Sequence, residues 1–141
     1  PEIAVELGKY YGRQLKDSPH YQSLDGIVPV PLHPRKQRMR GYNQSIEFAK
    51  GLSVSLGIPC YNRGLIRTTF TQTQTRKNRF ERLDNVSEVF KLGHSQKLAG
   101  KHLLLVDDVL TTGATLEACG QVLLKLPAVK LSMLTLAIAV H

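Results

Sequence analysis

The stretch that decides the fold of this chain is Lys101-His102-Leu103-Leu104-Leu105-Val106-Asp107-Asp108-Val109-Leu110-Thr111-Thr112-Gly113-Ala114-Thr115-Leu116. Residues 103–106 form an uninterrupted apolar run of the kind that parallel sheets bury on both faces, which predicts a strand at 101–106. Two acids follow, then small and hydroxyl-bearing residues, and we expect a helix from about Ala114. This order is typical of α/β proteins, which bind ligands outside the carboxyl ends of their strands.

The residues between that strand and that helix have the composition of a phosphate site. The start of a helix offers unpaired N–H groups and a positive dipole end, which favour an anion. Carboxylates such as Asp107 and Asp108 repel a phosphate but accept hydrogen bonds from sugar hydroxyls. The pattern therefore predicts a ribose held by the two acids, with its 5-phosphate in the loop beyond them. The residues expected around that phosphate are Thr111, Thr112, Gly113, Ala114 and Thr115, with the glycine allowing close approach of the backbone.

Two other interpretations fit parts of this stretch. Paired acids after an apolar strand also occur in receiver domains, where they hold Mg²⁺, but there the acids come early in the chain and a Thr-Thr-Gly-Ala-Thr loop has no role. A helix start capped by Asp or Thr with no ligand would explain a single such residue. Two acids, three threonines and a glycine within nine residues require more than a cap.

The rest of the chain alternates strands with helices, which predicts an α/β fold with a mostly parallel sheet flanked by helices. The periodicity of residues 1–15 places Ile3, Leu7, Leu15 and Tyr10 or Tyr11 on the buried side of a first helix. Asn43 is expected to cap a helix with Ile46, Ala49, Leu52 and Leu56 inward, ended by Gly57 and Pro59. Further helices are predicted at 76–83 and 114–126, and strands at 27–30, 65–68, 89–92 and 129–139.

Composition restricts the class of protein. The 141 residues fit a single domain, and 42% apolar residues suffice for a core. The longest apolar run, Leu136–Val140, is far shorter than the roughly 20 residues of a membrane helix, and the first fifteen residues lack the apolar region of a signal peptide. Cys60 and Cys119 stand apart without a partner motif, which favours reduced thiols and a cytoplasmic location.

The net charge of +8 is concentrated in two segments. Such clusters are either solvated faces or sites for polyanions, meaning nucleic acid or a molecule with several phosphates. The cations concerned are Arg35, Lys36, Arg38 and Arg40 in the first segment, and Arg63, Arg67, Arg76, Lys77, Arg79 and Arg82 in the second.

Residues 106–116 resemble the loop with which type I phosphoribosyltransferases bind phosphoribosyl pyrophosphate (PRPP). The wider chain, from about Asp25 onward, resembles the ComF family, which is linked to DNA uptake in competent bacteria and to gluconate utilisation. That resemblance is carried by Val28-Pro29-Val30-Pro31-Leu32-His33-Pro34, by Arg38-Met39-Arg40-Gly41-Tyr42-Asn43-Gln44 and by the segment Thr71–Arg79. Members of this family usually carry an N-terminal four-cysteine zinc module, so we expect residues 1–141 to be the single transferase domain of a longer chain.

The resemblance implies a glycosyltransferase of nucleotide metabolism, in which Asp107 and Asp108 hold the ribose and Mg²⁺ is bound mainly by PRPP oxygens and water rather than by a protein cage. It implies displacement at the anomeric carbon with release of pyrophosphate to an acceptor that the sequence does not identify. Pyrophosphate contacts are expected from Pro31, Leu32, His33, Arg38 and Arg40. A flexible loop that closes over the site is expected to include Gln72, Thr73, Gln74, Arg76, Lys77 and Arg79.

A second hypothesis is a non-catalytic module of the same fold that acts in DNA uptake by binding nucleic acid or partners of the uptake machinery. The positive charge favours it, whereas 6% aromatic residues, no Trp and basic clusters without interleaved aromatics do not suit a single-strand stacking platform. A homodimer is also consistent with the resemblance.

Overall fold

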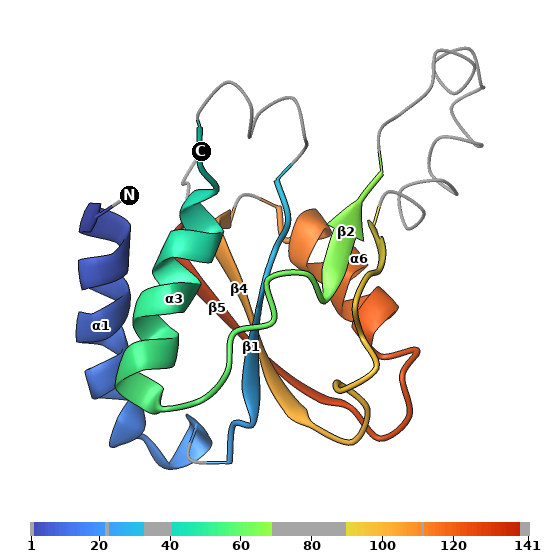
Figure 1. The fold of residues 1–141 in the computed structure, drawn as a ribbon, viewed down its shortest axis with the longest axis horizontal. Helices are drawn as coiled ribbons and strands as arrows, with labels where there is room; N and C mark the ends of the chain where they lie inside the picture. The colour runs from blue at the N-terminus through green and yellow to red at the C-terminus, as the bar shows by residue number, and fades with distance from the viewer. Residues whose placement is uncertain (1, 22, 33–40, 69–89, 111, 139–141) are drawn as a thin grey trace.

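The computed structural model describes residues 2–21, 23–32, 41–68, 90–110 and 112–138 (Figure 1). No helix in these ranges is long and apolar enough to cross a membrane. The elements, in chain order, are α1 (Glu2–Lys16), the 3₁₀ turn η1 (Pro19–Tyr21), β1 (Gly26–Pro29), α3 (Gln44–Leu56), β2 (Leu65–Arg67), β3 (Phe90–Leu92), β4 (His102–Leu110), α6 (Ala114–Leu123) and β5 (Lys130–Ile138).

The main sheet has the order β1-β4-β5, and both pairings are parallel. Val28 of β1 lies opposite Leu105, and Met133 of β5 lies opposite the same residue on the other side. Ile27 also forms a parallel bridge with Cys60, which continues the sheet beyond β1. The predicted parallel sheet is confirmed, with the 103–106 run in its central strand.

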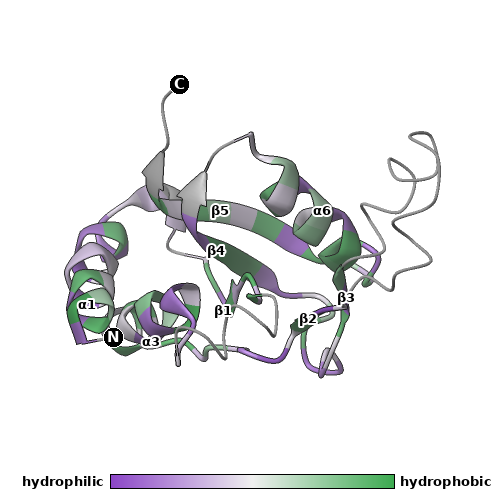
Figure 2. Cartoon of the chain, turned by 90° about the horizontal axis from the view of Figure 1, so that it is seen from above, coloured by the Kyte–Doolittle hydropathy of each residue, from purple (hydrophilic) through white to green (hydrophobic). Residues whose placement is uncertain are grey.

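Both faces of β4 are covered by helices, as Figure 2 shows. Leu104 and Val106 pack with α3 in one buried cluster, whereas Leu103 and Leu105 pack with α6 in another. Cys119 lies in the second cluster, fully buried, as its position on the inner face of the predicted helix indicated. Alternate residues of β4 therefore pack into two separate hydrophobic cores, one on each face of the sheet.

Helix α1 buries a different face from the one predicted. Its buried residues are Ala4, Gly8 and Gly12, whereas Ile3 is 78% exposed. Tyr10 and Tyr11 are exposed as well, and only Leu7 and Leu15 of the expected face pack against the core. The reason is steric, because a Cβ on Gly8 would overlap the Phe48 carbonyl oxygen and one on Gly51 the Val5 carbonyl oxygen. Glycine on both helices lets α1 and α3 approach closely along a small-residue stripe.

Helix α3 begins and ends where the sequence predicted. The Asn43 side chain accepts a hydrogen bond from the Ser45 N–H, with 2.9 Å between nitrogen and oxygen. Gly57 ends the helix in the left-handed region, with φ of 69°. Phe48, which was not among the expected inward residues, is buried together with Ala49 and Leu52.

Strands β2 and β3 confirm the two short strands predicted around residues 65–68 and 89–92. They pair antiparallel with each other in a separate two-stranded sheet, with Leu65 opposite Leu92. The predicted helix at 76–83 lies outside the described residues.

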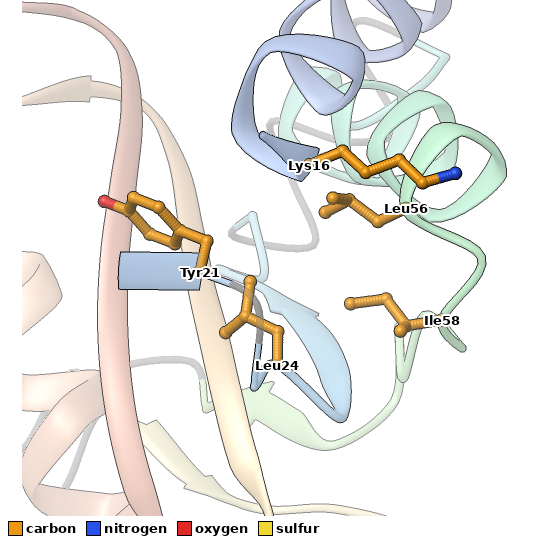
Figure 3. Close-up of a pocket in the computed structure, with 5 residues that line it drawn as sticks. All are labelled: Lys16, Tyr21, Leu24, Leu56 and Ile58. Atoms are coloured by element: carbon orange, nitrogen blue, oxygen red, sulfur yellow. The ribbon is translucent and has the colours of Figure 1, made fainter. Parts of the chain in front are cut away.

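A small cavity of about 190 Å³ lies below α1 and α3 (Figure 3). Leu24, Leu56 and Ile58 supply apolar walls, and the Lys16 side chain extends above Leu56. The polar residues among its walls are Lys16 and Tyr21.

Packing of α1 on α3 predicts a specific response to Gly51→Ala. Alanine raises helix propensity by about 0.8–1 kcal/mol, but the added Cβ must push the two helices apart because it meets backbone atoms. We expect a net loss of about 1–2 kcal/mol in the free energy of unfolding, as overpacked cores show, measured by urea denaturation.

The matched control is Gly120→Ala in α6, where the added Cβ would lie 3.1 Å from the movable end of the Met133 side chain. That variant should keep or raise stability. Equal stability of Gly51→Ala and wild type would contradict the close helix contact.

Candidate functional site

The two acids of the decisive stretch lie at the carboxyl end of the central strand. Asp107 is opposite Thr135 of β5, and it is 9% exposed. We expected the strand to end at Val106, but β4 continues to Leu110 because β5 continues to pair with it as far as Ile138. The acids therefore belong to the last part of a strand, and the loop before α6 is shorter than predicted.

A hydrogen-bond network fixes Asp107. Its Oδ1 accepts the Asp108 backbone N–H at 2.8 Å and the Ser45 hydroxyl at 3.4 Å. Asn43, which caps α3 through Ser45, also donates from Nδ2 to the Val30 carbonyl oxygen at 3.2 Å. The start of α3 thus connects the end of β1 to the carboxylate at the end of β4.

Ser45 is a member of the site that the sequence analysis missed. Asn43 was predicted as a helix cap and belongs, with Gln44, to a motif on which the family resemblance rests, and Ser45 directly follows that motif. Both side chains are buried and polar, and buried polar groups need partners. In the sequence, the only indication of this role was a serine two residues after the Asn cap. Its partner, Asp107, lies 62 residues further along the chain, so the sequence does not connect the two.

The environment of Asp107 raises its pKa to about 6. Burial is the largest cause, because it disfavours the charged form, and the neighbouring Asp108 carboxyl raises the pKa further. The Asp108 backbone N–H and the Ser45 hydroxyl act in the opposite direction by donating to the carboxylate. Asp107 is therefore a carboxyl that changes charge within one or two pH units of neutrality.

The predicted phosphate loop leads into the N-terminus of α6. Gly113 is the N-cap residue, with φ of 83°, a backbone conformation that favours glycine. Because glycine has no side chain, Gly113 itself makes no capping hydrogen bond and leaves space for a ligand to approach the first turn. Thr112 is exposed and its Oγ1 accepts the Ala114 N–H at 3.2 Å, and Thr115 is half-buried. Thr111 lies outside the described residues.

A cavity of about 370 Å³ adjoins this loop. It is lined by Gly113, Leu116 and Glu117 from the loop and α6, and by Met133 and Thr135 from β5. The sequence analysis did not include the two β5 residues, which reach the site because β5 pairs in parallel with β4.

The other predicted site residues divide into two groups. Pro31 and Leu32 are half-buried directly after Val30, whose N–H donates to the Val106 carbonyl oxygen at 2.8 Å. The end of β1 and the acids of β4 therefore lie at the same edge of the sheet. The remaining predicted residues lie outside the described ranges: His33, Arg38, Arg40, Gln72, Thr73, Gln74, Arg76, Lys77 and Arg79.

Within the described ranges, no three His, Cys, Asp or Glu side chains gather to form a metal cage. At the end of β4 the oxygen donors are the carboxylates of Asp107 and Asp108. This donor set fits Mg²⁺, which prefers one or two carboxylates together with substrate oxygens and water.

Solved structures with the same architecture include phosphoribosyltransferases. An adenine phosphoribosyltransferase matches 99% of this chain and 71% of its own, with a TM-score of 0.62 and 16% identity. The glutamine PRPP amidotransferase of Bacillus subtilis, solved with ADP and GMP, matches 92% of this chain and 26% of its own, with a TM-score of 0.60 and 22% identity. These similarities define the type I phosphoribosyltransferase fold.

Sequence comparison is more specific. Residues 43–137 match the phosphoribosyl transferase domain. Competence protein F of Haemophilus influenzae is 36% identical over 115 residues, which cover 81% of this chain and 50% of that protein. DNA utilization protein YhgH of Salmonella typhimurium is 33% identical over 127 residues, covering 88% of this chain and 55% of that protein. The chain belongs to the phosphoribosyl transferase domain family, in its ComF group, and spans about half the length of these relatives.

The raised pKa of Asp107 predicts a dependence of stability on pH. The folded state holds the proton up to about pH 6, whereas the ordinary pKa is 3.8. The unfolded state therefore binds fewer protons between these values, so the free energy of unfolding falls as pH rises from about 4 to 7. Asp107→Asn removes this fall. We expect the variant to gain about 1 kcal/mol relative to wild type between pH 4 and pH 7.5, less than the full shift because water reaches one side of the group.

The measurement is urea denaturation of both proteins across that pH range, with Asp17→Asn, a change at an exposed carboxylate outside the site, as the control for loss of one charge. A constant difference between wild type and Asp107→Asn at every pH would contradict the raised pKa.

Proposed function

We propose that this domain binds PRPP together with Mg²⁺ and transfers its phosphoribosyl group to an acceptor, with release of pyrophosphate. The observation that supports this most is the position of Asp107 and Asp108 at the carboxyl end of the central strand, directly before a glycine-capped helix N-terminus. The carboxylates can accept hydrogen bonds from ribose hydroxyls, and the N–H groups at the start of α6 can donate to a phosphate. The two kinds of group thus follow the order of the hydroxyls and the phosphate in ribose 5-phosphate.

The acids would bind the ribose. When ionised, Asp107 and Asp108 accept hydrogen bonds from the two ribose hydroxyls, and the network through Ser45 and Asn43 keeps Asp107 in place. The 5-phosphate would bind N–H groups at the start of α6, with Thr112 and Thr115 as hydroxyl donors. Glu117 in the first turn is exposed, and so water screens its repulsion.

The leaving group would bind on the β1 side of the same edge. Pro31 and Leu32 follow the strand there, and the chain continues to the cations Arg38 and Arg40. Mg²⁺, when bound with PRPP, would neutralise charge on the departing pyrophosphate. The protein itself would position the two ends of the substrate so that the anomeric carbon faces the acceptor, a contribution of orientation and charge.

The names of the relatives support a second candidate. Several of them are called competence or DNA utilization proteins. A domain that keeps the PRPP site without catalysis, and acts in DNA uptake by binding nucleic acid or a partner, would also account for the net charge of +8. The two candidates share the ligand site and differ in turnover.

Calorimetric titration with Mg²⁺ and PRPP tests the shared site. Asp107→Asn and Asp108→Asn should each weaken binding about tenfold or more, since a hydrogen bond to a charged group contributes roughly 1.5–3 kcal/mol. Gly113→Val should abolish binding, because a β-branched side chain resists φ of 83° and blocks the phosphate. Ribose 5-phosphate should compete with PRPP for this site.

Gly57→Val is the matched control, since Gly57 has a similar φ of 69° and open space around it but lies at the far end of α3. It should lose stability and retain binding. Normal PRPP affinity in both aspartate variants would refute the site, and a screen of acceptor bases for pyrophosphate release would separate the catalytic from the non-catalytic candidate.

A further inference from the structure

A third cavity, of about 510 Å³, opens near the opposite edge of the sheet. It is lined by Tyr61, His94, Gln96 and Lys97, which we call the basic pocket. The Tyr61 N–H donates to the Ile27 carbonyl oxygen at 2.8 Å, and a Cβ on Gly26 would touch its ring, so Tyr61 lies beside the start of β1. The basic pocket therefore lies near the amino end of β1, whereas Asp107 and Asp108 lie toward the carboxyl end of β4, which runs parallel to β1.

The two chain segments that form this pocket carry charge of one sign. The described segments 58–68 and 90–101 contain five cations and no acid: Arg63, Arg67, Lys91, Lys97 and Lys101. The ion pairs found between described residues, Lys9 with Glu6 and Lys50 with Glu47, lie on other elements. Asp25 at this edge accepts the His102 backbone N–H at 2.9 Å instead of pairing with a lysine. Lys97 and Lys101 are thus available to an anion.

An aromatic ring lies among these cations. The Lys101 ammonium is 5.8 Å from the centre of the Tyr61 ring, within the range of a cation–π contact. A solvated basic face needs neither a ring nor a hollow, and the basic clusters recognised in the sequence offered no aromatic partner. Here the fold brings Tyr61 to cations that are more than thirty positions away in the chain. A ligand that combines a flat ring with an anionic group would match both the Tyr61 ring and the cations around it.

The backbone around the pocket is already ordered. The His94 N–H donates to the Arg63 carbonyl oxygen at 2.7 Å, and the Gly93 N–H donates to the Gly64 carbonyl oxygen at 2.9 Å. A Cβ on Gly93 would overlap the Arg63 carbonyl oxygen, so glycine permits this close contact. The two pocket segments are tied together without a ligand, which lowers the entropy lost on binding.

We propose that the basic pocket binds a nucleotide, with the base against Tyr61 and Gln96 and the phosphate between Lys97 and Lys101. The Gln96 amide can both donate to and accept from a base edge, and lysine ammonium groups bind phosphate as point charges. The volume is in the range of small-molecule sites and exceeds what a lone phosphate needs. This proposal does not depend on PRPP binding at the other edge. A free nucleotide and a unit of single-stranded DNA present the same chemistry.

The test is a titration followed by amide NMR, in the Gly113→Val background so that the PRPP site is disabled. The probes are thymidine 5′-monophosphate, a short oligothymidylate strand and inorganic phosphate. Saturable shifts are expected at residues 61–64 and 93–101. The double variant Lys97→Glu with Lys101→Glu should weaken binding of both nucleotide probes about tenfold or more.

The matched control is Arg13→Glu with Lys16→Glu, which makes the same charge change at exposed cations in the last turn of α1, outside the pocket. It should weaken binding less than threefold at about 0.15 M salt, where charges more than roughly 8 Å apart are largely screened. Stronger binding of the strand than of the free nucleotide would identify DNA as the source of the ligand, and equal binding would identify a free nucleotide.

Three outcomes would overturn the proposal. Equal losses in the two double variants would indicate general attraction to a basic surface. Phosphate alone binding as tightly as the nucleotide would indicate an anion site without base recognition. Shifts confined to residues 107–116, or none at millimolar probe, would show that the pocket takes no nucleotide.

Discussion

The parallel pairing of β4 with β1 on one side and β5 on the other is the constraint on which the rest of the structure depends. It buries the 103–106 run on both faces, so two helical layers can attach to one strand. It also brings three strand ends to one edge, where Val30, Asp107 and Thr135 become neighbours although they come from distant parts of the sequence. Because the strand ends already bring these residues together, only short loops are needed to complete a polar site at that edge.

The sequence predicted those parts of the structure whose causes are local. The apolar run before Asp107, the Asn43 cap, the Gly57 stop and the glycine at the start of α6 each depend on a few consecutive residues, and each is confirmed. The buried face of α1 was predicted wrongly, because apolar periodicity favoured Ile3 and Tyr10 whereas Gly8 and Gly51 allow a closer helix contact. Apolar periodicity identifies the apolar face of a helix, but it does not show how closely a neighbouring helix can approach another face.

The composition of the site was predictable in part for the same reason. Asp107, Asp108 and Gly113 lie in one continuous motif, which carries its own indication of strand, loop and helix. Ser45 and Thr135 join the site only through tertiary pairing, and the length of β4 depends on how far β5 continues beside it. The raised pKa of Asp107 is likewise a property of the fold, since burial is its main cause and burial cannot be inferred from two adjacent acids in the sequence.

The β2–β3 pair has a consequence for how this domain tolerates change. These strands bond only to each other in the two-stranded sheet, and the pairing of Leu65 with Leu92 and of Arg67 with Phe90 holds the two ends of the intervening chain side by side. The stability of the three-stranded sheet is therefore largely independent of how many residues lie between Arg67 and Phe90, since lengthening a loop adds entropy only slowly. Lengthening or shortening that connection should therefore leave the register of the core unchanged, which makes it a suitable position for opening a circularly permuted chain.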